Sequence, residues 1–191
     1  MDLTNIFEGE RLRLTEINPK EDSEKDALWS HSIEYARARK GNPVRPISAL
    51  ESRKSLEEEL KEAEEEGNRF HFAIRSRDEK EGLLGFLDVV NIEWKNGQGF
   101  IQILLGSEAI CKEHLPESLQ LGLRYAFDEL NFYHVCMEIP VYEVATIAAL
   151  EKAGFTREAC LREIIFHEGK YHDRIIFGLL AEEWREQKGS K

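Results

Sequence analysis

The sequence predicts an α/β (α+β) fold, in which about seven strands and several helices form a single domain over residues 1–191. Segments with alternating apolar and polar side chains, which are typical of strands, are interspersed with segments of helical apolar spacing. The chain has the length of one domain. Hydrophobic residues make up 41% of it, which is enough for a sizeable core.

The first elements are a predicted strand and a predicted helix. Residues 11–17 alternate apolar and polar side chains, as a strand with one buried face does. Residues 26–40 carry apolar side chains at helical spacing, and the helix is expected to stop before Gly41. Pro43 and Pro46 then favour a turn, because proline lacks the N–H that a helix interior needs.

A second helix is predicted from its two ends. Ser48, followed three residues later by Glu51, forms a capping-box pattern, and Gly67 is a suitable end. Three strands are expected next, with Gly97 in the hairpin turn between the last two. These strands cover residues 69–75, 83–91 and 99–105.

The segment that follows predicts a loop and a helix suited to binding an anion. The loop covers residues 106–115, and the helix is expected to open at Pro116, because proline suits a first helical turn. The N–H groups and the dipole at a helix N-terminus favour phosphate. The apolar face of this helix comprises Leu119, Leu123, Ala126, Phe127 and Leu130.

The C-terminal third predicts a strand, a short helix and a hairpin. Pro140 ends the strand, Gly154 follows the helix, and the hairpin turns at Glu168 and Gly169. The expected ranges are 134–139 for the strand, 144–153 for the helix, and 160–167 and 173–180 for the hairpin.

Composition excludes several classes of function. A formal charge of −11 disfavours nucleic acid and suits a cationic substrate such as an amine, although acidity also serves solubility. No apolar run is long enough to span a membrane and no signal peptide is recognised, so a cytoplasmic protein without a membrane partner is expected. Cys111, Cys136 and Cys160 form no CxxC pair, so neither a disulfide framework nor a metal site is expected.

Several segments together resemble one known family. They are GERLRL (residues 9–14), LRYAFDELN (123–131), EKAGF (151–155), GKYHD (169–173) and the tail with Leu179, Leu180, Glu183 and Trp184. In their order along the chain and in their residues they resemble the GNAT N-acetyltransferases, in particular the branch of ribosomal-protein and spermidine acetyltransferases. The resemblance spans nearly the whole chain. It implies the GNAT fold, a mixed, mostly antiparallel twisted sheet flanked by helices and splayed between strands four and five.

The resemblance implies acetyl-CoA as co-substrate and a primary amine as acceptor. In the family the pantetheine arm pairs with the backbone of the fourth strand, which here is Ile103, Leu104 and Leu105. The amine attacks the thioester carbonyl directly, a step that needs a base, a donor to the carbonyl oxygen and an acid for the departing thiolate. The pyrophosphate rests on the loop before the helix, which aligns with Ile110, Cys111, Lys112, Glu113, His114 and Leu115.

Most of the family's special positions carry other residues in this chain. Glu113 and Leu115 stand where two glycines let backbone amides close on the phosphates. A non-glycine residue at positive φ costs roughly 1–2 kcal/mol, and a glutamate near a phosphate repels it. We therefore expect weakened binding of acetyl-CoA. The other departures are Ile110 for arginine or glutamine, Phe100 for glutamate, Glu143 for asparagine and Leu150 for tyrosine.

Three residues are candidates for the catalytic groups. Glu143, after the fifth strand, could accept the ammonium proton if burial raises its pKa, and it could equally complement the dipole of the next helix. Tyr142 could protonate the thiolate in place of the missing tyrosine. His114 could act as donor or acid, although an exposed loop histidine is more often idle.

Three acidic or aromatic residues are candidates for substrate binding. Asp88, Glu93 and Trp94 lie on or after the third strand, which faces the substrate entrance in the family. Glu93 and Trp94 suit a cationic amine through charge and cation–π contact, while packing beside the turn explains Trp94 equally well. His167 and His172 flank the hairpin turn without a third ligand nearby in sequence, so a solvated hairpin is favoured over a metal site.

Three functions remain open from the sequence. The first is an N-acetyltransferase that acts on a small amine or a peptide N-terminus. The second is a catalytically inactive binding or regulatory module with the same fold, and the third is an acyltransferase with a carrier-bound donor. The apolar run 175–180 is most simply a buried strand and could also form a homodimer interface.

Overall fold

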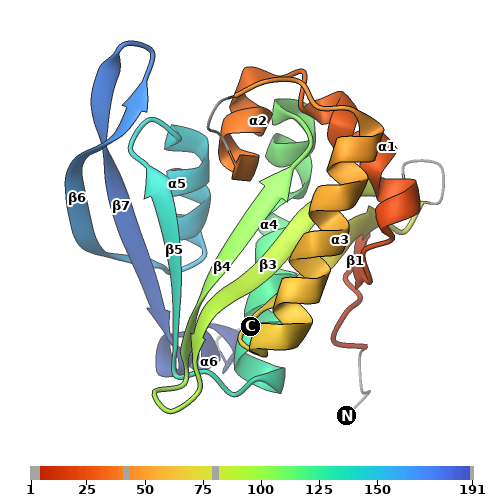
Figure 1. Cartoon of the computed structure of the whole chain (residues 1–191). Helices are drawn as coiled ribbons and strands as arrows, with labels where there is room; N and C mark the ends of the chain where they lie inside the picture. The colour runs from red at the N-terminus through yellow and green to blue at the C-terminus, as the bar shows by residue number, and fades with distance from the viewer. Residues whose placement is uncertain (1–4, 41–43, 79–81, 190–191) are drawn as a thin grey trace. The chain divides into compact units, whose positions relative to one another are not determined.

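The computed structural model describes residues 5–40, 44–78 and 82–189 (Figure 1). Within them, seven strands form one sheet in the order β1-β2-β3-β4-β5-β7-β6. The strands are β1 (Leu12–Thr15), β2 (Phe70–Ser76), β3 (Leu83–Glu93), β4 (Gln98–Leu105), β5 (His134–Pro140), β6 (Thr156–His167) and β7 (Lys170–Leu180). The helices are α1 (Pro19–Trp29), α2 (Ile33–Lys40), α3 (Ala49–Glu66), α4 (Glu108–Arg124), the π-helical η1 (Tyr125–Glu129), α5 (Val144–Lys152) and α6 (Ala181–Gly189).

β4 and β5 are parallel neighbours that pair over a short stretch. Their ladder runs from Gln98 and His134 to Phe100 and Cys136. In the described residues this ladder contains no pair beyond Phe100. The backbone of the later β4 residues is therefore not paired with β5. The β1–β2, β5–β7 and β6–β7 pairs are antiparallel. The predicted fold class, a mixed and mostly antiparallel sheet with flanking helices, is therefore confirmed.

The chain divides into two compact units, which are described separately. The first unit comprises Met1–Asp88 and Ile103–Gly122, and the second comprises Val89–Gln102 and Leu123–Lys191. β3, β4 and α4 contribute residues to both units. The single domain expected over residues 1–191 stays a prediction.

The first unit combines an apolar core with a buried polar network between its helices. Asp26 of α1 is fully buried and accepts hydrogen bonds from Tyr35 Oη (2.7 Å), Arg39 Nε (2.7 Å) and Ser52 Oγ. A buried carboxylate is tolerated when it is paired in this way. The core cluster consists of Leu56, Ala73, Leu83 and Phe86, with Ile17 and Trp29 packed against it.

The helix predicted over residues 26–40 is wrong in its bounds, because two helices occupy this part of the chain. α1 starts earlier, with Pro19 at its beginning and Asn18 as its N-cap, whose side chain accepts a hydrogen bond from the Lys20 N–H. Ser30 ends α1 and donates its hydroxyl hydrogen to the Ala27 carbonyl (2.6 Å). By contrast, α3 has the predicted capping box at its start and left-handed Gly67 (φ 63°) at its end.

In the second unit, β5, β7 and β6 lie side by side (Figure 1). β7 lies between its two antiparallel neighbours, and the hairpin turns at Glu168 and Gly169, which both have positive φ. The predicted hairpin is confirmed, and both of its strands begin earlier than predicted. Phe177 and Leu179 are fully buried, so the apolar run is an interior strand and not a free sheet edge.

The chain ends in a helix, α6, that the sequence analysis did not predict. Trp184 of α6 is buried, and its ring stacks on that of Phe127 with centroids 5.9 Å apart. No helix among the described residues has both the length and the apolar character needed to cross a membrane.

Candidate active site

The junction between β4 and α4 is shorter than the sequence predicts. α4 begins at Glu108, so the expected loop of residues 106–115 is reduced to Gly106 and Ser107, and the rest is helix. Pro116 lies inside α4 and does not open it. The predicted loop is therefore wrong, and the residues aligned with the family's phosphate loop form the first turns of a helix.

Ser107 explains the early start of α4. Its hydroxyl oxygen accepts a hydrogen bond from the Ile110 N–H (3.3 Å), and its carbonyl accepts one from the Cys111 N–H (2.8 Å). Lys112 pairs with Glu108 one turn earlier (2.6 Å), and this hydrogen bond raises the pKa of Lys112. Serine at the N-cap and an acidic residue in the first turn both favour a helix start, a signal that the prediction gave too little weight.

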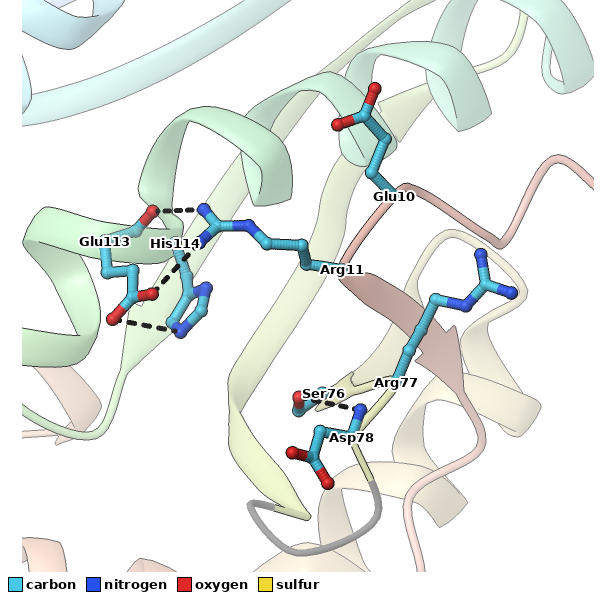
Figure 2. A pocket seen from close by; sticks show the side chains of 7 residues that line it. All are labelled: Glu10, Arg11, Ser76, Arg77, Asp78, Glu113 and His114. Carbon is cyan, nitrogen blue, oxygen red and sulfur yellow. Dashed lines mark hydrogen bonds and ion pairs between the residues drawn. The ribbon is translucent and has the colours of Figure 1, made fainter.

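Glu113 points toward β1. Its carboxylate accepts a hydrogen bond from Arg11 Nη1 (3.0 Å), and its carbonyl accepts one from Arg11 Nη2 (3.2 Å) (Figure 2). Neither Glu113 nor Leu115 has positive φ, so the strain expected from the missing glycines does not arise. The side chains of Glu113 and His114 line a polar pocket of the first unit together with Glu10, Arg11, Ser76, Arg77 and Asp78 (Figure 2).

His114 differs from its prediction as an exposed loop histidine. It lies in α4 and is buried, with only 5% of its surface exposed. Its Nδ1 is buried and has no hydrogen-bond partner among the described residues, while Nε2 lies 3.8 Å from Glu113 Oε2.

Asp88 has a partner that the sequence analysis missed. Its Oδ1 lies 2.7 Å from Nδ1 of His71 on β2. Burial lowers the pKa of His71, but the hydrogen bond and the charge of Asp88 outweigh it, so the pKa is raised overall. His71 Nε2 is buried and has no hydrogen-bond partner in the part of the chain that the structure describes. The 17-residue separation of the pair conceals it in the sequence, where only the register of β2 against β3 could have revealed it.

In the first unit, β3 lies beside β4, the strand expected to bind the pantetheine arm. The Gly106 N–H donates to the Leu84 carbonyl (3.0 Å), and a Cβ on Gly85 would overlap the backbone of Leu104 and Leu105. Asp88 follows Gly85 by three residues on the same strand. The His71–Asp88 pair and the segment Ile103, Leu104 and Leu105 therefore belong to neighbouring strands of one unit.

In the second unit, Glu143 lies at the N-cap position of α5. Its side chain makes no capping hydrogen bond, although its carbonyl accepts one from the Ile147 N–H (3.0 Å). Burial raises the pKa of Glu143, and a hydrogen bond with Thr146 opposes that shift in part. A half-buried carboxylate that does not cap its helix is the environment that the proton-acceptor hypothesis requires.

Tyr142 lies in an aromatic cluster near the turn of the β6–β7 hairpin. Its ring stacks on His167, with centroids 4.2 Å apart, and meets His172 edge-on at 5.2 Å. The two histidines, which the sequence analysis expected on a solvated hairpin, are therefore half covered by this tyrosine.

Glu93 and Trp94 lie at the opposite end of β5 from Glu143. They belong to the β3–β4 turn, whose Gly97 carbonyl accepts hydrogen bonds from the residues at the start of β5, and the Trp94 ring meets Phe132 edge-on at 6.3 Å. Seven strand residues at about 3.3 Å each span roughly 20 Å, and Glu143 follows the other end. One small amine thus cannot touch both places. Trp94 is 53% exposed, and the substrate role of Glu93 and Trp94 stays a prediction.

Comparison with known proteins identifies the family of this chain. The family model described as the acetyltransferase (GNAT) domain matches residues 11–156, well over half of the chain. The chain belongs to the GNAT acetyltransferase family. This GNAT enzyme is an N-acetyltransferase that uses acetyl-CoA and an amine, so the enzyme interpretation is confirmed over the inactive module.

Among related sequences, the chain is similar to the uncharacterized N-acetyltransferase YokL, derived from prophage SPbeta in Bacillus subtilis (strain 168). The two are 29% identical over 182 residues, which cover 95% of this chain and 96% of YokL. Spermidine N(1)-acetyltransferase of Vibrio cholerae is 25% identical over 96 residues, which cover 50% of this chain and 56% of that enzyme. YdaF of Bacillus subtilis, a candidate ribosomal N-acetyltransferase, is 26% identical over 56% of this chain and 58% of its own. The expected relation to both kinds of enzyme is confirmed.

Solved structures confirm the fold. Spermidine N-acetyltransferase from Vibrio cholerae, crystallised with CoA and spermine, superposes with a TM-score of 0.72 at 17% identity, covering 93% of this chain and 99% of that one. A GCN5-related N-acetyltransferase from Brucella melitensis gives a TM-score of 0.73 at 22% identity, covering 96% and 82%.

Proposed function

We propose that this GNAT enzyme binds acetyl-CoA along Ile103, Leu104 and Leu105 of β4 and at the start of α4, and that His71, oriented by Asp88, is the base that deprotonates a cationic primary amine. The observation that carries this proposal is the His71 Nε2 atom. It is buried without a hydrogen-bond partner in the described residues, while Nδ1 is held by a carboxylate.

Donor binding is supported by unused backbone on β4. The ladder with β5 ends at Phe100, which leaves the next β4 residues for the pantetheine amides. The start of α4 would hold the pyrophosphate, but Ser107 already accepts from the Ile110 and Cys111 N–H groups. We therefore infer that phosphate binding is weakened because these N–H groups are already hydrogen-bonded to Ser107. The charge of Glu113 is not the cause, since its carboxylate is paired with Arg11.

The chemistry requires a proton acceptor that works near neutral pH. An alkylammonium has a pKa near 10 and must lose a proton before its nitrogen attacks the thioester carbonyl. A carboxylate on Nδ1 fixes the histidine tautomer and leaves the Nε2 lone pair free for that proton. Because Nε2 is buried, the proton reaches it when the amine, or one water that the amine holds, enters beside it.

Glu143 is the second candidate for the base. The absence of a capping hydrogen bond and its raised pKa support it. A carboxyl is nevertheless a weaker base than a histidine with a raised pKa, so we rank it second. Tyr142 remains the proposed acid for the thiolate, and His114 is left out because it is buried in α4.

The proposed acceptor is a cationic amine, either a polyamine or a basic peptide. The charge of −11 supports it, since an acidic protein attracts cations over distance. Relatives named as spermidine and candidate ribosomal N-acetyltransferases support the same class.

The test combines binding and turnover. Calorimetric titration with acetyl-CoA should give one site per chain, and mass spectrometry should find an acetyl group on spermidine or on a lysine-rich peptide. Failure to bind acetyl-CoA up to millimolar concentration would overturn the proposed donor site. Binding without acetylation of either cation would overturn the acceptor class.

We further propose a cytoplasmic homo-oligomer. None of the three cysteines forms a disulfide in the described residues, which suits a reducing compartment. The Vibrio cholerae spermidine enzyme has a structure described as dodecameric. In this chain a second copy would cover the exposed apolar residues of the β6–β7 hairpin, which are Leu161, Ile164, Phe166 and Tyr171. Sedimentation of a variant with Phe166→Ser should then show a smaller species.

A further inference from the structure

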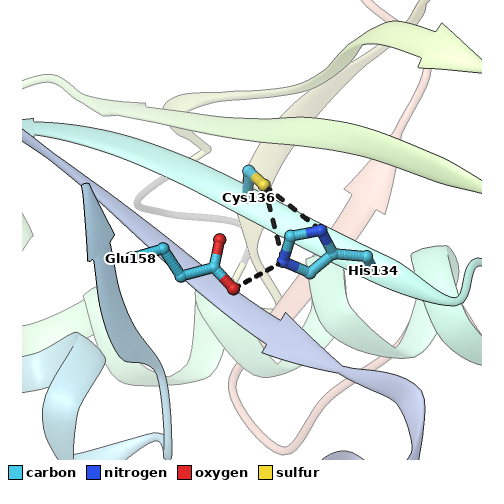
Figure 3. Close-up of side chains that lie close together, drawn as sticks. All are labelled: His134, Cys136 and Glu158. Atoms are coloured by element: carbon cyan, nitrogen blue, oxygen red, sulfur yellow. Dashed lines mark hydrogen bonds and ion pairs between the residues drawn. The ribbon is translucent and has the colours of Figure 1, made fainter.

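Three side chains from two strands meet on one face of the second unit (Figure 3). His134 and Cys136 come from β5, and Glu158 comes from β6. Their ligand atoms all lie within 4.8 Å of one another. His134 Nε2 is 2.9 Å from Glu158 Oε1 and 3.7 Å from Cys136 Sγ.

The strands bring these residues together in a specific way. His134 and Cys136 are two positions apart on β5, so their side chains share one face of the sheet. Glu158 lies on β6, and β7 runs between β6 and β5. To reach the other two residues, its side chain must cross β7.

Two features of the backbone allow that crossing. The register of β6 against β7 shifts between Arg157 and Ala159, which makes Glu158 the extra residue of a β-bulge. Bulges redirect a side chain in this way. On β7, the residue beneath the crossing is Gly178, where a Cβ would overlap the Glu158 carboxylate. The glycine is thus required for the position of Glu158.

We propose that His134, Cys136 and Glu158 bind a divalent transition-metal ion, with Zn²⁺ as the best match. Imidazole nitrogen, thiolate sulfur and carboxylate oxygen are all zinc ligands. Tetrahedral bonds of about 2.0–2.3 Å place ligand atoms roughly 3.3–3.8 Å apart. The 3.7 Å between His134 Nε2 and Cys136 Sγ lies in this range, and the 2.9 Å between His134 Nε2 and Glu158 Oε1 would widen slightly around the ion. A thiolate and a carboxylate would neutralise the two charges of the ion, and solvent would supply the fourth ligand.

The cluster is better suited to a metal than to nucleophilic catalysis. Burial, together with the smaller effect of the charges of Glu158 and Glu138, raises the pKa of Cys136 to about 11. A thiol in this environment keeps its proton and is a weak nucleophile. The same negative surroundings attract a cation, and binding of the ion would displace the thiol proton to solvent.

The test uses the full-length chain without a histidine tag and Co²⁺ as a spectroscopic probe for the zinc site. We expect one Co²⁺ per chain, a thiolate-to-cobalt charge-transfer band in the near ultraviolet, and displacement of Co²⁺ by Zn²⁺. Cys136→Ser should abolish the band. Cys160→Ser is the matched control, because this thiol is exposed and outside the cluster, and it should leave the band unchanged.

Two further variants test the geometry. Gly178→Ala should weaken Co²⁺ binding about 10–100-fold, the range found when a metal site loses supporting interactions, and Glu158→Gln, which removes a ligand, should weaken it at least as much. If Gly178→Ala fails to fold, Glu158→Gln still decides the question. A band that survives Cys136→Ser, or an affinity unchanged by Glu158→Gln, would overturn the proposal.

Discussion

Two carboxylates that the sequence analysis singled out lie in different environments, one in each unit. Asp88 of the first unit is bound to a histidine, 2.7 Å from His71 Nδ1. Glu143 of the second unit lies at the start of a helix without capping it. In the first case a charge raises the pKa of the partner histidine, and in the second case burial raises the pKa of the carboxyl itself.

The difference shows that a raised pKa has different consequences for different groups. Both shifts favour the protonated form, which is cationic for His71 and neutral for Glu143. A base works only when deprotonated, so each hypothesis predicts a rate that falls as the pH drops below the raised pKa. The acid limb of the pH–rate profile, where the rate falls, lies near neutral pH for a histidine and at lower pH for a carboxyl. The pH profile therefore separates the two candidates.

The largest expected effect is the loss of turnover in His71→Gln. Glutamine is polar and similar in size to histidine but cannot accept the proton, so kcat/KM should fall about 10²–10⁴-fold. Steady-state assays with acetyl-CoA and spermidine measure it, and melting curves confirm folding. His31→Gln, an exposed histidine, is the matched control. If Glu143→Gln costs more than His71→Gln, the ranking of the two bases is reversed.

Asp88→Asn should change the pH profile without removing the base. Without the carboxylate charge the pKa of His71 falls, so the acid limb of kcat/KM should move to lower pH. A raised folded-state pKa stabilises the protein below the unfolded pKa of histidine, and this contribution is lost as the pH rises through the folded value. The variant should therefore lose more stability at pH 5 than at pH 8 in urea unfolding. If the acid limb of kcat/KM stays at the same pH in this variant, His71 is not the base.

A smaller effect is expected from Ser107→Ala at the start of α4. Loss of the N-cap should lower the free energy of unfolding by about 1 kcal/mol. The Ile110 N–H that Ser107 now binds would become available, so CoA affinity should be kept or increased in calorimetry. A large loss of CoA affinity with unchanged stability would mean that the hydroxyl itself binds the donor.

The smallest effect is expected from Glu113→Ala. Its ion pair with Arg11 is more than half exposed on both sides, and such pairs contribute about 0.2–1 kcal/mol. Because the carboxylate points toward β1, CoA affinity should change less than about threefold. A carboxylate ~4 Å from a phosphate would instead cost about 4 kcal/mol at an effective dielectric of ~20, which is roughly thousandfold in affinity. A marked gain in CoA affinity would show that Glu113 faces the phosphates after all.

Local patterns predicted elements well where the decisive interactions were themselves local. The capping box of Ser48 and Glu51 and the turn at Glu168 and Gly169 involve neighbouring residues, and both are confirmed. At Ser107 two local signals competed, and serine at the N-cap prevailed over proline as the first helical residue. The loop prediction failed there because proline at the first helical position was given more weight than capping chemistry.

Of the candidate site, the sequence analysis found Asp88 and Glu143 but missed His71. A histidine in an alternating strand has no local signal of its role, because its partner lies 17 residues away. The predicted substrate pair of Glu93 and Trp94 stays a prediction, and the structure adds that both residues lie at the other end of β5 from Glu143. Proximity in sequence to the third strand does not reveal at which end of β5 a residue lies.

The sequence by itself determined the order of the seven strands, the family and the acidic character of this protein, because side-chain periodicity and charge are properties of local segments. Tertiary structure alone decided the distant contacts. Only strand register joins His71 to Asp88, and only a bulge and a glycine bring Glu158 across β7 to His134 and Cys136. A backbone brings side chains within 3–4 Å only after the strands have paired, and the sequence does not contain the register in any single segment.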